Sequence, residues 1–133
     1  MAVVSTETAP IQSEADVVAV RRRVRDMSAQ LGFGLVDQTK VVTAASELAR
    51  NTIVHGGGGM MLMESLNGPR TGLRLTFEDK GPGIADIELA MRDGFTTGSG
   101  LGLGLGGAKR LVSEFEITSR VGEGTKITVT RWK

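Results

Sequence analysis

Residues 98–112 read GSGLGLGLGGAKRLV, and this stretch constrains the fold more than any other part of the chain. Glycine at alternate positions lets the backbone lie directly against a ligand, and the residues that follow are typical of a helix, whose first N–H groups lack partners. Such an arrangement suits an anion, above all a phosphate. A flexible linker would be polar, whereas Leu101, Leu103 and Leu105 favour burial. We therefore predict a loop that contacts a ligand.

Two common nucleotide loops do not fit this stretch. Gly102, Gly104 and Gly107 match the spacing of a dinucleotide-binding turn, but that turn must follow a strand, and residues 91–97 are polar and lack a strand period. A Walker loop ends in Gly-Lys-Ser/Thr, whereas here Gly107 leads to Ala108. The phosphates must be held by a third arrangement, with metal and adenine contacts elsewhere in the chain.

The composition predicts one domain spanning residues 1–133. The chain has no cysteine, and 16 basic residues balance 15 acidic ones, which argues against a nucleic-acid partner. No signal-like segment and no run of eighteen apolar residues is present, so we expect a cytoplasmic protein without a membrane partner. The basic cluster at residues 21–25 is expected to be a solvated helix face, with a partner-binding patch as the alternative.

The first third of the chain predicts a strand and a helix. Residues 3–11 alternate loosely, as a strand would. Ser13 is expected to be the N-cap of an amphipathic helix, with Asp16 near the place of a capping-box acid, and Gly32 is expected to end that helix. Its apolar stripe consists of Val17, Val20, Val24, Met27 and Leu31.

A second helix is expected over residues 38–55, capped by Asp37 and stopped by the four glycines at 56–59. Glu47 and Asn51 are four residues apart, which places a carboxylate and a carboxamide side by side on this helix. On a plain helix they would be surface residues. Their neighbours Ala44, Leu48 and Thr52 are small or apolar, however, so we expect this face to be covered.

The remaining segments predict strands at residues 60–66, 73–78, 115–121 and 125–130, and a helix after the glycine run. Asp79 shares the inward parity of Phe77, and a buried acid needs a partner, for which an adenine amino group would serve. Thr125 would face the same layer. The order of elements favours an α/β two-layer sandwich, with a mixed sheet and helices on one face.

Four motifs resemble, in kind and in their order along the chain, the ATP-binding boxes of the GHKL superfamily, which includes gyrase, heat-shock chaperones, MutL and histidine kinases. They are Glu47 with Asn51, residues 79–84, the glycine run, and Gly124 with Thr125. Within this superfamily, and over nearly its whole length, the chain is most similar to the small anti-sigma-factor kinases, in particular RsbT-like switch kinases of the stressosome. The resemblance implies a Bergerat-type fold.

The resemblance also implies roles for individual residues. Asn51 would be the magnesium ligand, Glu47 the catalytic base or water-positioning residue, and Asp79 the acceptor from the adenine amino group, supported by Thr125. Gly81 and Gly83 would let the backbone approach the base and ribose, and His55 is expected to be structural. The phosphates of ATP would be wrapped by Gly98, Gly100, Gly102, Leu103, Gly104, Leu105 and Gly106.

The implied activity is that of a serine/threonine protein kinase that uses ATP and Mg²⁺. Its substrate would be a STAS-domain antagonist protein of the RsbS or RsbR kind, and a PP2C-type phosphatase of the RsbU kind would be a further partner. The alternative is a non-catalytic, ATP-dependent binding module, an anti-sigma factor or a phosphatase activator. A standalone ATPase of the MutL or gyrase type is disfavoured, because no transducer domain is present.

Overall fold

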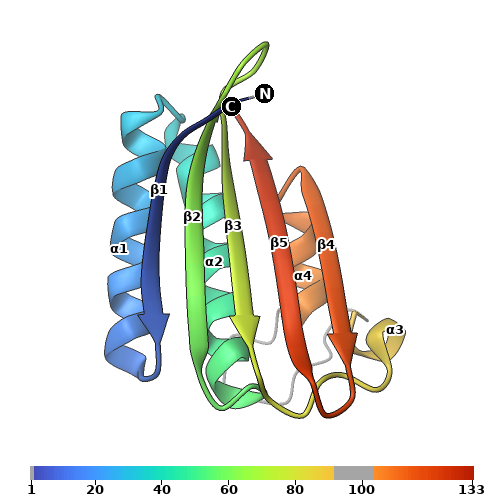
Figure 1. Cartoon of the computed structure of the whole chain (residues 1–133). Helices are drawn as coiled ribbons and strands as arrows, with labels where there is room; N and C mark the ends of the chain where they lie inside the picture. Colours follow the sequence, from blue (N-terminus) through green and yellow to red (C-terminus); the bar gives the residue numbers. More distant parts are fainter. Residues whose placement is uncertain (1, 92–103) are drawn as a thin grey trace.

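A computed structural model describes residues 2–91 and 104–133, and its centre is a five-stranded sheet (Figure 1). Along the sheet the strands follow the order β1-β2-β3-β5-β4. Their bounds are Ala2–Ile11 for β1, Gly59–Asn67 for β2, Gly72–Asp79 for β3, Glu114–Arg120 for β4 and Gly124–Trp132 for β5. The expected strands are all present, each within a few residues of its predicted ends.

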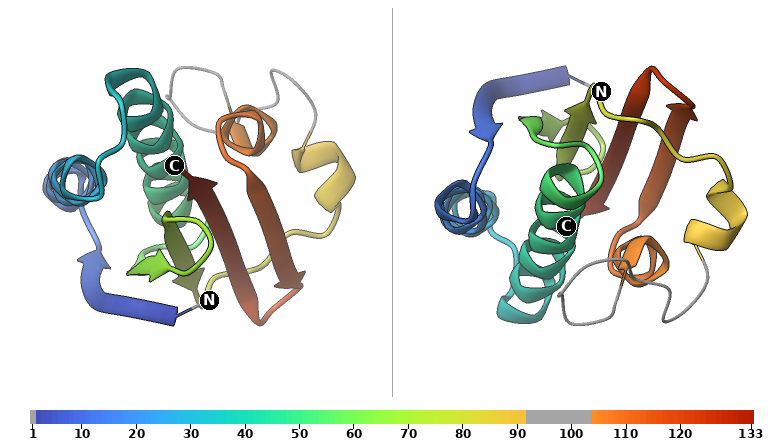
Figure 2. Two further views of the ribbon diagram at one scale, coloured as in Figure 1. Left: turned by 90° about the horizontal axis from the view of Figure 1, so that it is seen from above. Right: turned by 90° about the horizontal axis from the view of Figure 1, so that it is seen from below.

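The longer helices lie on one face of the sheet, as the views along the strands show, and a single-turn helix lies beside the edge formed by β4 (Figures 1 and 2). They are α1 (Glu14–Gln30), α2 (Leu35–Val54), the single-turn α3 (Ile87–Ala90) and α4 (Gly104–Arg110). Helix α2 lies in the middle of the layer, with α1 on one side and α4 on the other (Figure 2). No helix in the described ranges is both long and apolar enough to span a bilayer.

The expected fold class is confirmed, with one correction to the strand pairing. Each of the four neighbouring strand pairs is antiparallel, so the part of the sheet that the structure describes is not mixed. The physical reason lies in the connection from β1 to β2, which contains two long helices. Two helices carry the chain along the sheet and back again, so β2 starts at the end where β1 stops.

The helix ends agree only partly with the sequence. Ser13 is the N-cap of α1 but makes no side-chain cap bond, while the Asp16 carboxylate accepts from the Gln12 N–H at 2.8 Å. Gly32 ends this helix with a φ of 85°. The prediction that Asp37 caps α2 is wrong, because the helix begins at Leu35 and Gly34 is its N-cap. The carboxylate of Asp37 instead binds the guanidinium of Arg131 at 2.5 Å.

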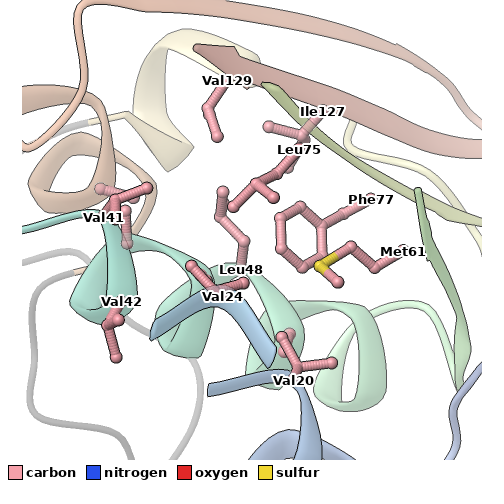
Figure 3. Close-up of a cluster of buried hydrophobic side chains, with 14 of the residues drawn as sticks. Val20, Val24, Val41, Val42, Leu48, Met61, Leu75, Phe77, Ile127 and Val129 are labelled. Atoms are coloured by element: carbon pink, nitrogen blue, oxygen red, sulfur yellow. The ribbon is translucent and has the colours of Figure 1, made fainter. Parts of the chain in front are cut away.

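The core lies between α2 and the sheet (Figure 3). Leu48 of α2 points among Leu75 and Phe77 of β3, and all three side chains are buried. Val20 and Val24 add the buried stripe of α1, as the helical period predicted. Helix α2 is therefore held along most of its length, and residues on its remaining face are fixed in position.

Charged side chains sit at the periphery of this core. Arg21, Arg22 and Arg25 are exposed, as expected for a solvated face. Arg23 differs, because its guanidinium binds both carboxylate oxygens of Glu7 on β1, at 2.7 and 2.5 Å. The hydrogen bonds from Arg23 hold the pKa of the Glu7 carboxyl below its ordinary value, against a smaller opposing effect of burial.

Candidate active site

A cavity of about 320 Å³ opens beside the C-terminal half of α2. One wall is a single face of this helix, because its residues recur at helical spacing. The opposite wall comes from the segment after β3, from α3 and from the start of α4. The helix contributes Glu47, Arg50, Asn51, Val54 and His55, and the opposite wall contributes Gly83, Ile84, Ala85, Asp86, Leu89, Ala90, Gly104 and Leu105.

Glu47 and Asn51 lie together in the helix wall, as their spacing predicted. The Glu47 side chain is only 8% exposed, and Asn51 is half-buried. Ala44, Leu48 and Thr52 are all buried, so the expectation that this face is covered is confirmed. The cavity therefore offers a carboxylate and a carboxamide within one helical turn of each other.

Asp79 ends β3 and lies directly opposite Thr125 of β5 in the strand register. Both side chains are buried, with 8% of Asp79 and 6% of Thr125 exposed, which confirms their inward parity. The Asp79 Oδ1 atom accepts a hydrogen bond from the Gly81 N–H at 2.9 Å. This bond fixes the carboxylate where the strand turns into the segment that lines the cavity.

Asp79 and Thr125 do not themselves line this cavity, and neither do Gly81 and Gly106. Asp79 and Thr125 instead border a shallower hollow of about 270 Å³ at the end of the sheet. The structure thus brings together Glu47, Asn51, Gly83, Gly104 and Leu105 in one cavity and places the acid and threonine pair beside it.

Ser119 of β4 is a site residue that sequence reasoning missed. Its Oγ accepts from the Ile84 N–H at 2.7 Å, lies 2.8 Å from the Thr125 Oγ1 atom and donates to the Gly124 carbonyl at 3.2 Å. Ser119 therefore links Thr125 to the cavity wall at Ile84. In the observed register Ser119 lies opposite Thr125, where two hydroxyls can bond across strands. The expected hairpin, with its turn at residues 122–124, pairs Val121 with Thr125 instead and gave no such signal.

The sequence predicts only that Gly56 helps to end α2, but in the structure it packs against the Asp79 side chain. A Cβ built at Gly56 would lie 2.5 Å from the Asp79 Oδ2 atom, and one built at Gly81 would lie 2.6 Å from the Gly56 Cα. Gly83 has a φ of 78°, and a Cβ there would overlap the Arg120 carbonyl. Gly81 and Gly83 are thus required by close approach of this chain's own backbone, and their contacts with a base or ribose remain a prediction.

The last part of the glycine run is helical. Gly104, Leu105 and Gly106 belong to the first turn of α4, so the prediction of a loop is wrong for Gly104 and Gly106, while Leu105 lies in the helix expected after the run. The same helix was expected to include Leu111 and Val112, but it ends at Arg110. Leu105 and Ala108 are buried against the core, and this packing outweighs the low helix propensity of glycine. Gly98, Gly100, Gly102 and Leu103 lie outside the described residues.

The geometry fits what comparison with known proteins finds. Residues 36–133 match the family model described as histidine kinase-, DNA gyrase B-, and HSP90-like ATPase. The serine/threonine-protein kinase RsbT of Bacillus subtilis (strain 168) is 47% identical over 123 residues, which cover 92% of each chain. An anti-sigma F factor of Thermoanaerobacter sp. (strain X514) is 32% identical over 84% of this chain and 82% of its own.

A solved structure supports the fold independently. The RsbU and RsbW domains of Rv1364c from Mycobacterium tuberculosis superpose with a TM-score of 0.67 at 23% identity. This match covers 97% of the present chain and 32% of the longer one. The expectation of an ATP-dependent protein serine/threonine kinase is confirmed by the family model together with the similarity to RsbT. The chain belongs to the histidine kinase-, DNA gyrase B- and HSP90-like ATPase family, the GHKL superfamily predicted from its four motifs.

Proposed function

We propose that this chain is a partner-switching kinase, which transfers the γ-phosphoryl group of ATP to a hydroxyl side chain of a STAS-domain antagonist protein. The observation that carries the proposal is the pairing of Glu47 with Asn51 in one cavity wall. A carboxylate can accept the proton of an attacking hydroxyl, and a neighbouring carboxamide oxygen can bind the metal that accompanies the triphosphate. Phosphoryl transfer depends mainly on positioning and on charge, both of which a rigid helix face provides.

The donor set of the cavity fits magnesium. Asn51 and Glu47 offer oxygen atoms, the ligands that Mg²⁺ prefers, and Mg²⁺ is commonly held by one or two protein oxygens together with phosphates. Within residues 2–91 and 104–133 no group of three or more His, Cys, Asp or Glu side chains could hold a metal ion. The proposed Mg²⁺ would therefore be bound jointly by the protein and the phosphates. Mg²⁺ would supply the charge that neutralises the phosphates during transfer.

The charges of the cavity also favour a metal-dependent ligand. Among the described lining residues, Glu47 and Asp86 carry carboxylates and Arg50 carries a guanidinium. Two negative groups and one positive group repel a free triphosphate, because charges interact strongly where water is partly excluded. A triphosphate neutralised by a divalent cation would bind far better than the free anion.

The adenine end of the nucleotide would lie toward Asp79. Its carboxylate would accept from the exocyclic amino group, since a carboxylate only accepts, and Thr125 would support it from the opposite strand. Gly81 and Gly83 would follow the base and ribose, and the glycine run from Gly98 to Gly106 would contact the phosphates. Guanine presents an oxygen where adenine presents this amino group, so the proposal includes a preference for ATP over GTP.

The test is phosphoryl transfer by the Glu47→Gln variant. The purified chain is mixed with radiolabelled ATP, Mg²⁺ and the STAS-domain proteins encoded near its gene, and phosphate incorporation is mapped. Glu47→Gln should abolish incorporation while ATP and the STAS-domain protein still bind. The matched control is Glu116→Gln, which alters an exposed acid on β4 and should leave transfer unchanged. Full transfer by Glu47→Gln would contradict the assigned base.

The second candidate is a non-catalytic binding module, and the name of a relative that is 32% identical, an anti-sigma F factor, supports the binding part of this alternative. In this case ATP would only set the conformation in which the chain binds a sigma factor or activates a PP2C-type phosphatase. Tight, ATP-dependent binding of such a partner by both the original chain and Glu47→Gln, without phosphate incorporation in either, would favour the module over the kinase.

A further inference from the structure

Arg50 lies between two carboxylates that come from different helices. Its Nη1 atom is 3.7 Å from Oε1 of Glu47 on the same helix, and its Nη2 atom is 3.5 Å from Oε1 of Glu14 in the first turn of α1. The Arg50 side chain is 29% exposed and also lines the cavity. One guanidinium thus bridges the proposed base and the helix next to it.

The Glu47 carboxylate depends on this guanidinium. A carboxylate that is 92% buried is costly unless an opposite charge or hydrogen bonds compensate it. Within the described ranges, the ion pair of Glu47 at 4 Å or less is the one with Arg50. Among the described residues, Arg50 is therefore the cation placed to compensate this carboxylate.

The guanidinium is not locked onto either acid. Charge-assisted hydrogen bonds between nitrogen and oxygen are usually about 2.7–2.9 Å long, and both distances here are greater. Glu14 is 68% exposed, whereas Glu47 is almost covered, so one end of the bridge meets solvent and the other meets the cavity. Exposed ion pairs usually add little to stability, so a purely structural reason for this bridge is weak.

We propose that Arg50 is a positioning residue, which aligns the Glu47 carboxylate for phosphoryl transfer, and that Glu14 is its outer anchor. The inference rests on the proposed role of Glu47 as the base. If Glu14 anchors Arg50, the alignment of the Glu47 carboxylate depends on the first turn of α1, where Glu14 lies. That turn lies outside residues 36–133, the part of the chain that matches the family model.

The test separates catalysis from nucleotide binding and needs no protein acceptor. The rate of phosphate release from ATP to water, with Mg²⁺ present, is measured for Arg50→Gln, Arg50→Lys, Glu14→Gln and the double variant of Arg50→Gln with Glu14→Gln. Arg50→Gln should lower kcat about ten- to a hundredfold, because a small misplacement of a catalytic group costs this much, while the KM for ATP stays nearly constant. Arg50→Lys should recover part of the loss.

The double variant tests whether Glu14 acts through Arg50. Glu14→Gln should lower kcat severalfold, and the double variant should be no slower than Arg50→Gln alone, since residues that act through one contact are not additive. Matched controls are Arg23→Gln and Glu7→Gln, which break an ion pair between α1 and β1 and should leave kcat unchanged. An unchanged kcat in Glu14→Gln, or independent losses in the double variant, would overturn the inference.

The outcome is distinguishable from failure of the proposed function. If Glu47→Gln releases phosphate at the original rate, the assigned base is wrong and the positioning role falls with it. If Glu47→Gln is inactive while Arg50→Gln and Glu14→Gln keep the original kcat, only the positioning role is overturned. Should Arg50→Gln fail to fold, Glu14→Gln decides the matter, because Glu14 is largely exposed and its loss leaves the fold intact.

Discussion

The substitution Gly56→Ala tests the link between the end of α2 and Asp79. Gly56 does not adopt a positive φ, so alanine can take the same backbone conformation and only the added methyl group matters. This methyl would lie 2.5 Å from the Asp79 Oδ2 atom, whereas ordinary contacts begin at 3.4 Å. The two groups must therefore separate by about 1 Å, the difference between those distances.

The magnitude follows from how this overlap is relieved. Inserting a methyl group into packed surroundings usually costs about 1–3 kcal/mol. If Asp79 moves, its carboxylate leaves both the Gly81 N–H and the position at which it would accept from adenine. Loss of a hydrogen bond to a charged group costs about 1.5–3 kcal/mol, so ATP affinity should fall about ten- to a hundredfold.

The assay is titration with ATP and thermal melting of Gly56→Ala beside Gly57→Ala. Gly57 has a φ of 72° and no atom within 4 Å of a built Cβ, so its alanine adds about 1 kcal/mol of backbone strain without touching Asp79. Gly57→Ala should lower Tm and keep the original ATP affinity, whereas Gly56→Ala should lose affinity. Original ATP affinity in Gly56→Ala would refute the reasoning that places Asp79 at the adenine.

Four further outcomes are expected. Asp79→Asn should keep the fold and lose about 1.5–3 kcal/mol of ATP binding, and equal ATP and GTP affinities in the original chain would contradict the adenine role. Chelation of Mg²⁺ should weaken ATP binding sharply in an isothermal titration, and an unchanged affinity would exclude a metal-bound nucleotide. Arg131→Met should lower Tm by several degrees, because Arg131 joins the first turn of α2 to the Leu111 carbonyl just beyond the end of α4. The hydrogen bond with Arg23 lowers the pKa of Glu7 in the folded state. The ion pair therefore stabilises the protein fully at pH values above the unfolded pKa of about 4.5, and this contribution is lost as the pH falls through the folded pKa. Melting below pH 4.5 should therefore be less pH-dependent in Arg23→Gln than in the original chain, and parallel pH profiles would contradict this account.

Features that depend on one element were predictable from the sequence. The inward parity of Asp79 follows from its strand, and the shared face of Glu47 and Asn51 follows from the helical period. Both arguments need only the repeat of one helix or one strand. The same arguments could not show that Asp79 lies beside the cavity lined by Glu47 and not in its wall, because this depends on how several segments meet.

The errors at helix ends have a common physical cause. Asp37 is a good capping residue by local rules, but the structure uses it as the partner of Arg131, 94 residues away in the chain. Gly104 and Gly106 favour a loop by propensity, yet the burial of Leu105 and Ala108 holds them in a helix. In each case a contact distant in sequence outweighs a local preference of about 1 kcal/mol.

The four glycines at 56–59 show most clearly what a local argument lacks. By composition they are equivalent, and each of them predicts only the end of a helix. In the structure their surroundings differ, because a Cβ at Gly57 would meet nothing while one at Gly56 would overlap the carboxylate of Asp79. The distinction arises from the segment at residues 79–81, which crosses the helix end so closely that the backbone of Gly56 forms part of the wall around the acid. Gly56 is therefore required because a side chain there would displace the carboxylate of Asp79. The ATP affinity of Gly56→Ala measures this requirement directly, because Asp79 is the residue proposed to bind adenine.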